Sequence, residues 1–168
     1  TNVNLGTVLR IAPLAKVPRT LSLGEGIANV LRELTPADAR DVYQAIRRAQ
    51  PGGLGRVDTA DVAGEPPDDL VAAMRLAADR DMVARQYAES FHHVLSIVVP
   101  RIVQGLASGW HLSDVLVRLH LQLMSEFPDS LIARRLGEQV TAESAARAAK
   151  VLSLGQPGDE EYQLGVAD

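Results

Sequence analysis

The sequence contains no cysteine, few aromatic residues and no long uninterrupted hydrophobic run. The absence of cysteine excludes disulfides, zinc–thiolate sites and thiol catalysis, and it is typical of a cytoplasmic protein. Because aromatic residues make up only 4% of the chain, we expect aliphatic side chains to form its core. The longest apolar stretch, 94–103, contains Ser96, Pro100 and Arg101 and is too short to cross a membrane. Nothing at the start of the chain resembles a signal peptide.

Positive charge is also scarce. The chain has two lysines and a net charge of -4 at pH 7. No block of basic residues stands clear of acidic neighbours, which argues against a nucleic-acid partner. Arginine supplies nearly all the positive charge, and its guanidinium group binds phosphate or carboxylate through paired hydrogen bonds. The composition is therefore compatible with an anionic ligand, although a GC-rich genome produces the same bias.

Helical signals recur along the whole chain, whose 168 residues suggest one domain. Ser22 and Glu25 form the pattern of a capping box, and Thr35 precedes Pro36 at another helix start. The alternation of apolar and polar residues that indicates strands is missing. Helices are expected over residues 4–15, 22–34, 35–49, 68–79, 81–106, 111–127, 129–136 and 141–154.

We therefore predict an all-α fold, a multi-helix orthogonal bundle of seven or eight helices in a single domain over 1–155. Residues 156–168 are predicted to form a flexible tail. The chain begins without methionine and ends without a helix cap, so we expect a piece of a longer protein. His120 has apolar helical neighbours and is expected in the core rather than as a metal ligand. The other expected core residues are Leu54 and the pairs Val42/Ile46, Val94/Ile97 and Leu116/Leu123.

Two segments carry residue types that bind phosphate. In Asn2-Val3-Asn4-Leu5-Gly6, amides and unpaired N–H groups at a helix start suit an anion, although Asn4 can simply cap the helix. Arg47-Arg48 precede the glycine-rich segment Pro51-Gly52-Gly53-Leu54-Gly55. Such a turn can present N–H groups to phosphate, or it can merely end the helix. It is not a P-loop, because no Gly-Lys-Ser/Thr follows.

A third group combines acidic residues with arginines. It consists of Asp58, Asp61, Glu65, and Asp79-Arg80-Asp81 with Arg85. Such carboxylates can hold Mg²⁺ against a polyphosphate, with Arg80 or Arg85 balancing the charge. Asp81, Arg85 and Glu89 follow one another at i,i+4 spacing, so a surface salt-bridge ladder is the alternative. Asp79 and Asp81 point about 200° apart on one helix, so they can share an ion only if the helix breaks there.

The order of these segments resembles the triphosphoribosyl-dephospho-CoA synthase family (ATP:dephospho-CoA triphosphoribosyl transferase). It is similar in particular to a divergent branch from bacteria that oxidise one-carbon compounds. The matching segments lie in roughly the first 90 residues, and residues 125–130 extend the likeness. They are Asn2–Gly6, Asp41–Arg47 with Pro51–Gly55, Asp61–Pro66 and Ala78–Asp81. Two features depart from the family: Val3 replaces a usual threonine, and the family's acidic, histidine-bearing N-terminal segment and C-terminal Asn-Pro-Gly region are absent.

The resemblance implies an all-α enzyme that moves the triphosphoribosyl group of ATP, with Mg²⁺, to a hydroxyl of dephospho-CoA or a related acceptor and releases adenine. Its partners would be ATP and dephospho-CoA-like molecules, without nucleic acid or membrane, and a homo-oligomer is compatible with it. Asp79, Glu65 and Asp61 are the implied catalytic residues, and Asp79 and Asp81 the implied metal ligands. The implied nucleotide- and phosphate-binding residues are Asn4, Gly6, Arg47, Gly52, Gly53, Arg80 and Arg85.

The alternative interpretation is a non-catalytic helical interaction module or a degenerate family member. An enzyme requires these residues to gather around one pocket, whereas a module leaves them scattered over the surface. The arrangement of the candidate residues in space therefore tests the two interpretations against each other.

Overall fold

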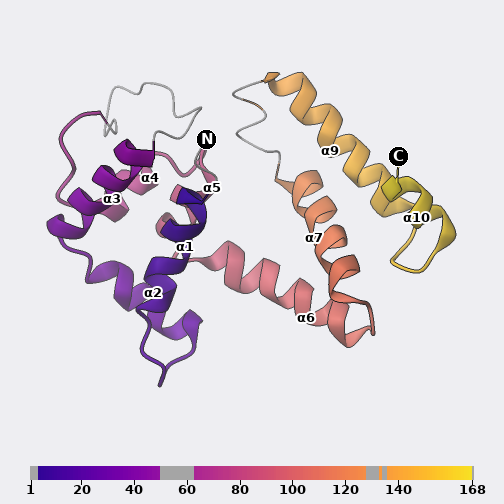
Figure 1. Ribbon diagram of the computed structural model, residues 1–168, viewed down its shortest axis with the longest axis horizontal. Helices are drawn as coiled ribbons and strands as arrows, with labels where there is room; N and C mark the ends of the chain where they lie inside the picture. The colour runs from indigo at the N-terminus through magenta and orange to yellow at the C-terminus, as the bar shows by residue number, and fades with distance from the viewer. Residues whose placement is uncertain (1–3, 50–62, 128–132, 134–135, 168) are drawn as a thin grey trace. The chain divides into compact units, whose positions relative to one another are not determined.

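A computed structural model describes residues 4–49, 63–127, 133 and 136–167 of the chain. It divides into two compact units, residues 1–95 and 96–168. All regular structure in the described residues is helical (Figure 1), which confirms the all-α prediction. These residues form nine α-helices and one π-helix, more than the seven or eight helices expected. The orthogonal packing of the helices stays a prediction.

The N-terminal unit contains α1 (Leu5–Ala15), α2 (Leu23–Arg32), α3 (Pro36–Ala49), α4 (Leu70–Arg75) and α5 (Met82–Ala88). Both predicted helix starts are confirmed. Ser22 and Glu25 bond each other's backbone N–H groups at 3.3 and 3.0 Å in a capping box. Thr35 and Asp38 do the same at 3.3 and 2.8 Å. These reciprocal bonds satisfy N–H groups that a helix start otherwise leaves unpaired.

The two capping boxes should make the fold lose stability in acid. Their hydrogen bonds lower the pKa of Glu25 and Asp38 below the ordinary values of 4.5 and 3.8. Because the pKa is lowered, the ionised carboxylate stabilises the fold at any pH above its ordinary pKa. This stabilisation is lost as the pH falls through the lowered pKa. We expect Ser22→Ala and Thr35→Ala to melt earlier than wild type at neutral pH and to approach it as the pH falls through the lowered pKa values of Glu25 and Asp38. Thr20→Ala, at an exposed loop position, should match wild type throughout. Parallel pH curves for all four proteins would contradict the role of the carboxylates.

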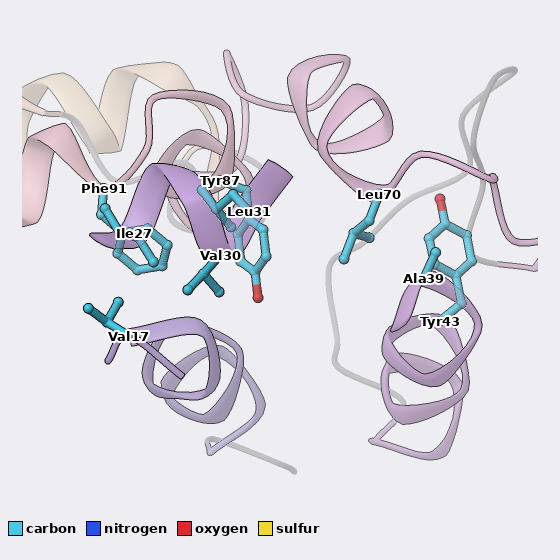
Figure 2. Packing of buried hydrophobic residues seen from close by; sticks show 9 residues of the cluster. All are labelled: Val17, Ile27, Val30, Leu31, Ala39, Tyr43, Leu70, Tyr87 and Phe91. Carbon is cyan, nitrogen blue, oxygen red and sulfur yellow. The ribbon is translucent and has the colours of Figure 1, made fainter. Parts of the chain in front are cut away.

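A cluster of buried side chains forms the core of the N-terminal unit (Figure 2). Its members are Val17, Ile27, Val30, Leu31, Ala39, Tyr43, Leu70, Tyr87 and Phe91. Ile46 is buried as predicted, whereas Val42 packs against the cluster only half-buried. Leu54 lies outside the described residues. The core therefore draws on every helix from α2 to α5, with α1 packing against α2, α3 and α5.

The prediction of one long helix over 81–106 is wrong. α5 ends at Ala88, a π-helix follows over His93–Val98, and α6 spans Val99–Ala107. Ser90 and Phe91 between them have positive φ values of 50° and 61°, in the left-handed region that non-glycine residues disfavour. The buried Gln86 side chain supports the break, because its Oε1 accepts the N–H of Val94 at 3.3 Å. No glycine or proline marks this break in the sequence.

The C-terminal unit contains α6, α7 (Leu112–Glu126), α9 (Glu138–Ser153) and α10 (Glu160–Ala167). α7 packs against α6 and α9, and α10 packs against α9. At the end of α7, Arg101 of α6 binds Glu126 at 2.8 Å. Most of the helix expected over 129–136 lies outside the described residues. No described helix combines the length and the apolar character needed to span a membrane.

Residues 156–168 contain a helix that the sequence patterns did not reveal. α10 lies in this segment and buries Tyr162 to 2% exposure. Arg118 of α7 stacks against the rings of Tyr162 and Trp110, at 5.5 Å from each ring centre. Its Nη1 also donates to the carbonyl of Gly155 at 2.8 Å. The predicted flexibility of the segment stays a prediction.

The core predictions for the second half of the chain are largely wrong. α7 buries Val115 and Leu119, whereas Leu116 is 48% exposed and Leu123 half-buried. His120 is exposed, so it is not a core histidine. α7 has apolar residues on most of its circumference, and periodicity alone therefore does not identify the face that packs. Val94 and Ile97 are half-buried and fall in different units, so the predicted pairs do not form one core.

Candidate functional site

A groove of about 280 Å³ lies between the first turns of α1 and the last turn of α3. It is lined by Asn4, Leu5, Val8, Ala45, Arg48 and Ala49. Four of these side chains are apolar, while Asn4 and Arg48 supply an amide and a guanidinium group. Such a groove offers hydrogen-bond donors and positive charge beside an apolar surface. A ligand with an anionic part and a less polar part matches this chemistry.

Asn4 stands at the N-cap position of α1, with backbone angles of the right-handed helical region. Within the described part of the chain, its side chain makes no capping hydrogen bond. A typical N-cap residue has an extended backbone instead, as Ser22 has at the start of α2. The interpretation of Asn4 as a side-chain cap of α1 is therefore not supported, and its predicted contact with a nucleotide stays a prediction.

Arg47 and Arg48 take different roles at the end of α3. Arg47 donates through Nη2 to the carbonyl oxygen of Gly64. This bond holds the residue before Glu65 next to the last turn of α3. Arg48 instead lines the groove with Asn4. Adjacent residues on a helix point about 100° apart, so the two arginines cannot face the same side.

Arg47 and Arg48 together were predicted beside a phosphate-binding turn, and the resemblance singled out Arg47, whereas Arg48 lines the groove. A signal for Arg48 was present in the sequence. Arg48 and Ala45 are three residues apart and share a helix face. Both side chains line the groove, whose other side is formed by α1.

Gly6 lies on the side of α1 that packs against α5 and is not among the described groove residues. A Cβ atom at Gly6 would lie 3.4 Å from Cγ2 of Val83, in ordinary van der Waals contact. The first turn of α1 therefore adjoins α3 through the groove and the start of α5 through Gly6. The predicted contact of Gly6 with a nucleotide stays a prediction.

The acidic residues around α5 are arranged mainly for structure. Oδ1 of Asp81 caps α5 by accepting the N–H groups of Val83 and Ala84 at 2.8 and 3.1 Å. Nε of Arg85 donates to the carbonyl of Ala78 at 3.0 Å, and its distance to Oε1 of Glu89 is 3.9 Å. The Arg85–Glu89 pair is thus one step of the salt-bridge ladder, and Asp81 is a helix cap.

Asp79 and Arg80 are exposed in the turn between α4 and α5, outside both helices. The helix breaks before Asp81, which meets the condition for Asp79 and Asp81 to approach one ion. However, no three histidine, aspartate or glutamate side chains of the described residues come together as a metal site. The described carboxylates therefore do not form a metal cage by themselves.

The predicted convergence of Asn4, Gly52, Gly53, Glu65, Asp79 and Arg80 on one pocket stays a prediction. Of these residues, Asn4 lines the groove, and the exposed Glu65 follows the residue that Arg47 binds. In the described part of the chain, the groove lining includes neither Asp79 nor Arg80. Gly52, Gly53 and Asp61 lie outside the described residues, as does Asp58. The assignment of catalytic and metal-binding roles to these residues stays a prediction.

Comparison with known protein families identifies the family of this chain. A family model described as CitG, ATP:dephospho-CoA triphosphoribosyl transferase, matches residues 1–168. No curated protein and no solved structure matches the chain. The family match covers both compact units, including the half of the chain in which the sequence motifs were sparse.

Proposed function

This chain belongs to the CitG family of ATP:dephospho-CoA triphosphoribosyl transferases, and we propose that its groove between α1 and α3 binds the triphosphate of ATP. Family membership implies transfer of the triphosphoribosyl group from ATP to dephospho-CoA. Because the match spans the whole chain, both units belong to one family domain. Membership favours an enzyme over the non-catalytic helical module.

One observation carries the proposal for the groove: Asn4 and Arg48, from helices far apart in the sequence, line it together. The planar guanidinium of Arg48 can donate two parallel hydrogen bonds to phosphate oxygens. The amide of Asn4 can donate a further one. The apolar surface of Leu5, Val8, Ala45 and Ala49 suits the ribose of the same molecule.

The proposed reaction joins an acceptor hydroxyl oxygen to C1′ of the ATP ribose as the bond from C1′ to adenine breaks. The hydroxyl proton passes to a carboxylate, and the leaving adenine takes up a proton, so the triphosphate stays on the transferred ribose. We propose Glu65, Asp61 or Asp79 as this carboxylate. Glu65 is favoured among the described ones, because the Arg47–Gly64 bond keeps it near the end of α3.

Mg²⁺ enters the proposal as a companion of ATP. Protein sites for Mg²⁺ use one or two carboxylates, and substrate phosphates and water supply the other ligands. Asp79 and Asp81 are the proposed carboxylates, with Arg80 and Arg85 offsetting phosphate charge. Since the described residues do not form a metal cage, no step of the proposed reaction depends on the ion.

The finer identity of the enzyme belongs to the same proposal. We propose a divergent family branch whose acceptor is dephospho-CoA or a related hydroxyl compound. Val3, in place of the family's usual threonine, supports that divergence. A cytoplasmic location is supported by the absence of cysteine from the sequence.

Arg48→Gln should weaken the binding of Mg²⁺–ATP about ten-fold or more, equivalent to about 1.4 kcal/mol. The change removes the positive charge and the paired donors while keeping a polar side chain of similar length. Isothermal titration calorimetry on the chain measures the effect. The matched control is Arg40→Gln, an exposed position on the same helix, which should bind like wild type. Equal affinities for Arg48→Gln and Arg40→Gln would overturn the groove as the triphosphate site.

A further inference from the structure

We infer that Tyr87 is a positioning residue for the groove: it holds α1 against α5 through a backbone carbonyl that Pro13 leaves without its helical donor. The inference rests on the proposed function of the groove. It concerns the side of α1 next to the one that lines the groove.

Pro13 lies inside α1 and is buried. In an α-helix, the N–H of residue 13 would donate to the carbonyl of residue 9, but proline has no N–H. The hydroxyl of Tyr87 donates to this carbonyl of Leu9 at 2.6 Å. Tyr87 is 3% exposed, and burial raises its pKa to about 12. The hydroxyl therefore keeps its proton, and with it the ability to donate, at neutral pH.

The spacing of residues along α1 separates two faces. Gly6, Leu9 and Pro13 follow one another at i,i+3 and i,i+4 and lie on one side of the helix. Gly6 approaches Val83 and Leu9 binds Tyr87, so this side faces α5. Asn4, Leu5 and Val8 form the neighbouring side that lines the groove.

The packing at Gly6 and the hydrogen bond at Leu9, one turn apart, therefore hold α1 against α5. At Gly6 the glycine leaves room for Val83, because a Cβ atom there would lie 3.4 Å from its Cγ2, and this packing has little directional preference. The hydrogen bond at Leu9 is directional and short, so it limits sliding of the helix along its axis. Because Val8 directly precedes Leu9, a shift at the carbonyl moves the groove lining with it.

The test combines Tyr87→Phe with Pro13→Ala. The second substitution should restore the stability of the protein but not the position of α1 against α5. Tyr87→Phe should lower the melting temperature, because the part-buried carbonyl of Leu9 loses its donor. It should also weaken Mg²⁺–ATP binding about five-fold. Adding Pro13→Ala gives the carbonyl an N–H donor within α1, so the double variant should melt close to Pro13→Ala alone. Its affinity for Mg²⁺–ATP should nevertheless stay about five-fold weaker, because α1 is no longer tied to α5.

Calorimetry with Mg²⁺–ATP and thermal melts of the four proteins separate the outcomes. An affinity of the double variant equal to that of Pro13→Ala alone would overturn the inference, because Tyr87 would then serve stability only. Wild-type stability and affinity in Tyr87→Phe would overturn it as well. If Tyr87→Phe does not fold, the double variant still decides. If Arg48→Gln also binds Mg²⁺–ATP normally, the proposed function of the groove fails, and this inference falls with it.

Discussion

Replacing Phe91 with alanine should lower the free energy of unfolding of the chain by about 3–5 kcal/mol. Phe91 is fully buried and packs against the ring of Tyr87, with ring centroids 5.8 Å apart. The alanine variant keeps the left-handed backbone, with its unfavourable φ of 61°, but loses the burial that compensates for it. A left-handed non-glycine residue costs about 1–2 kcal/mol, so the burial of the ring has to exceed this cost.

Denaturant unfolding followed by circular dichroism measures this loss. Phe91→Leu refills most of the space and should cost clearly less than the alanine variant. His92→Ala, at the exposed neighbouring position, should change stability by less than about 0.5 kcal/mol. A similar small effect for Phe91→Ala and His92→Ala would show that the ring does not hold the turn between α5 and the π-helix.

The second large effect concerns two glycines of α2, whose replacement by alanine should change the stability of the chain in opposite directions. Gly26→Ala should destabilise the chain by about 1–3 kcal/mol, because the new Cβ would lie 2.3 Å from Cγ1 of Val17. Val17 is buried and β-branched, so its side chain has few alternative rotamers. Gly24→Ala, in the same helix with no described atom within 4 Å of its Cβ, should stabilise the chain by about 0.5–1 kcal/mol.

Thermal melts of the two variants therefore should move in opposite directions. Val17→Ala added to Gly26→Ala provides the space that the new methyl group needs and should recover part of the loss. If Gly26→Ala and Gly24→Ala shift the melting temperature in the same direction, the close approach of α2 to Val17 is incorrect.

The features predicted correctly from the sequence are those that neighbouring residues determine. Ser22 with Glu25, and Thr35 with Asp38, fix helix starts through bonds between residues three apart. The break at Ser90 and Phe91 depends instead on tertiary contacts: the burial of a ring and the Gln86 side chain. The local pattern from Asp81 onward is helical, so nothing near the break could reveal it.

The same division applies to the candidate site. The order of the short motifs was sufficient to identify the family, which the family match confirms. That Arg48 lines the groove while Arg47 bonds the carbonyl of Gly64 depends on how α1 and Gly64 lie against α3, and the local sequence pattern does not contain this information. Likewise, Asp81 is a predicted metal ligand, and its Oδ1 caps α5. Residue type alone did not reveal the cap, and the metal-binding role stays a prediction.

The stacking of Arg118 between Trp110 and Tyr162 has a spectroscopic consequence. Trp110 is the single tryptophan of the sequence and belongs to the C-terminal unit. Its indole emission therefore senses the immediate surroundings of α7 and α10. Undocking of α10 would take the ring of Tyr162 away from the guanidinium group of Arg118, which also lies over Trp110, and so change the environment of the indole. The chain thus carries an intrinsic fluorophore that reports on one of its two units, whereas far-ultraviolet circular dichroism averages over both.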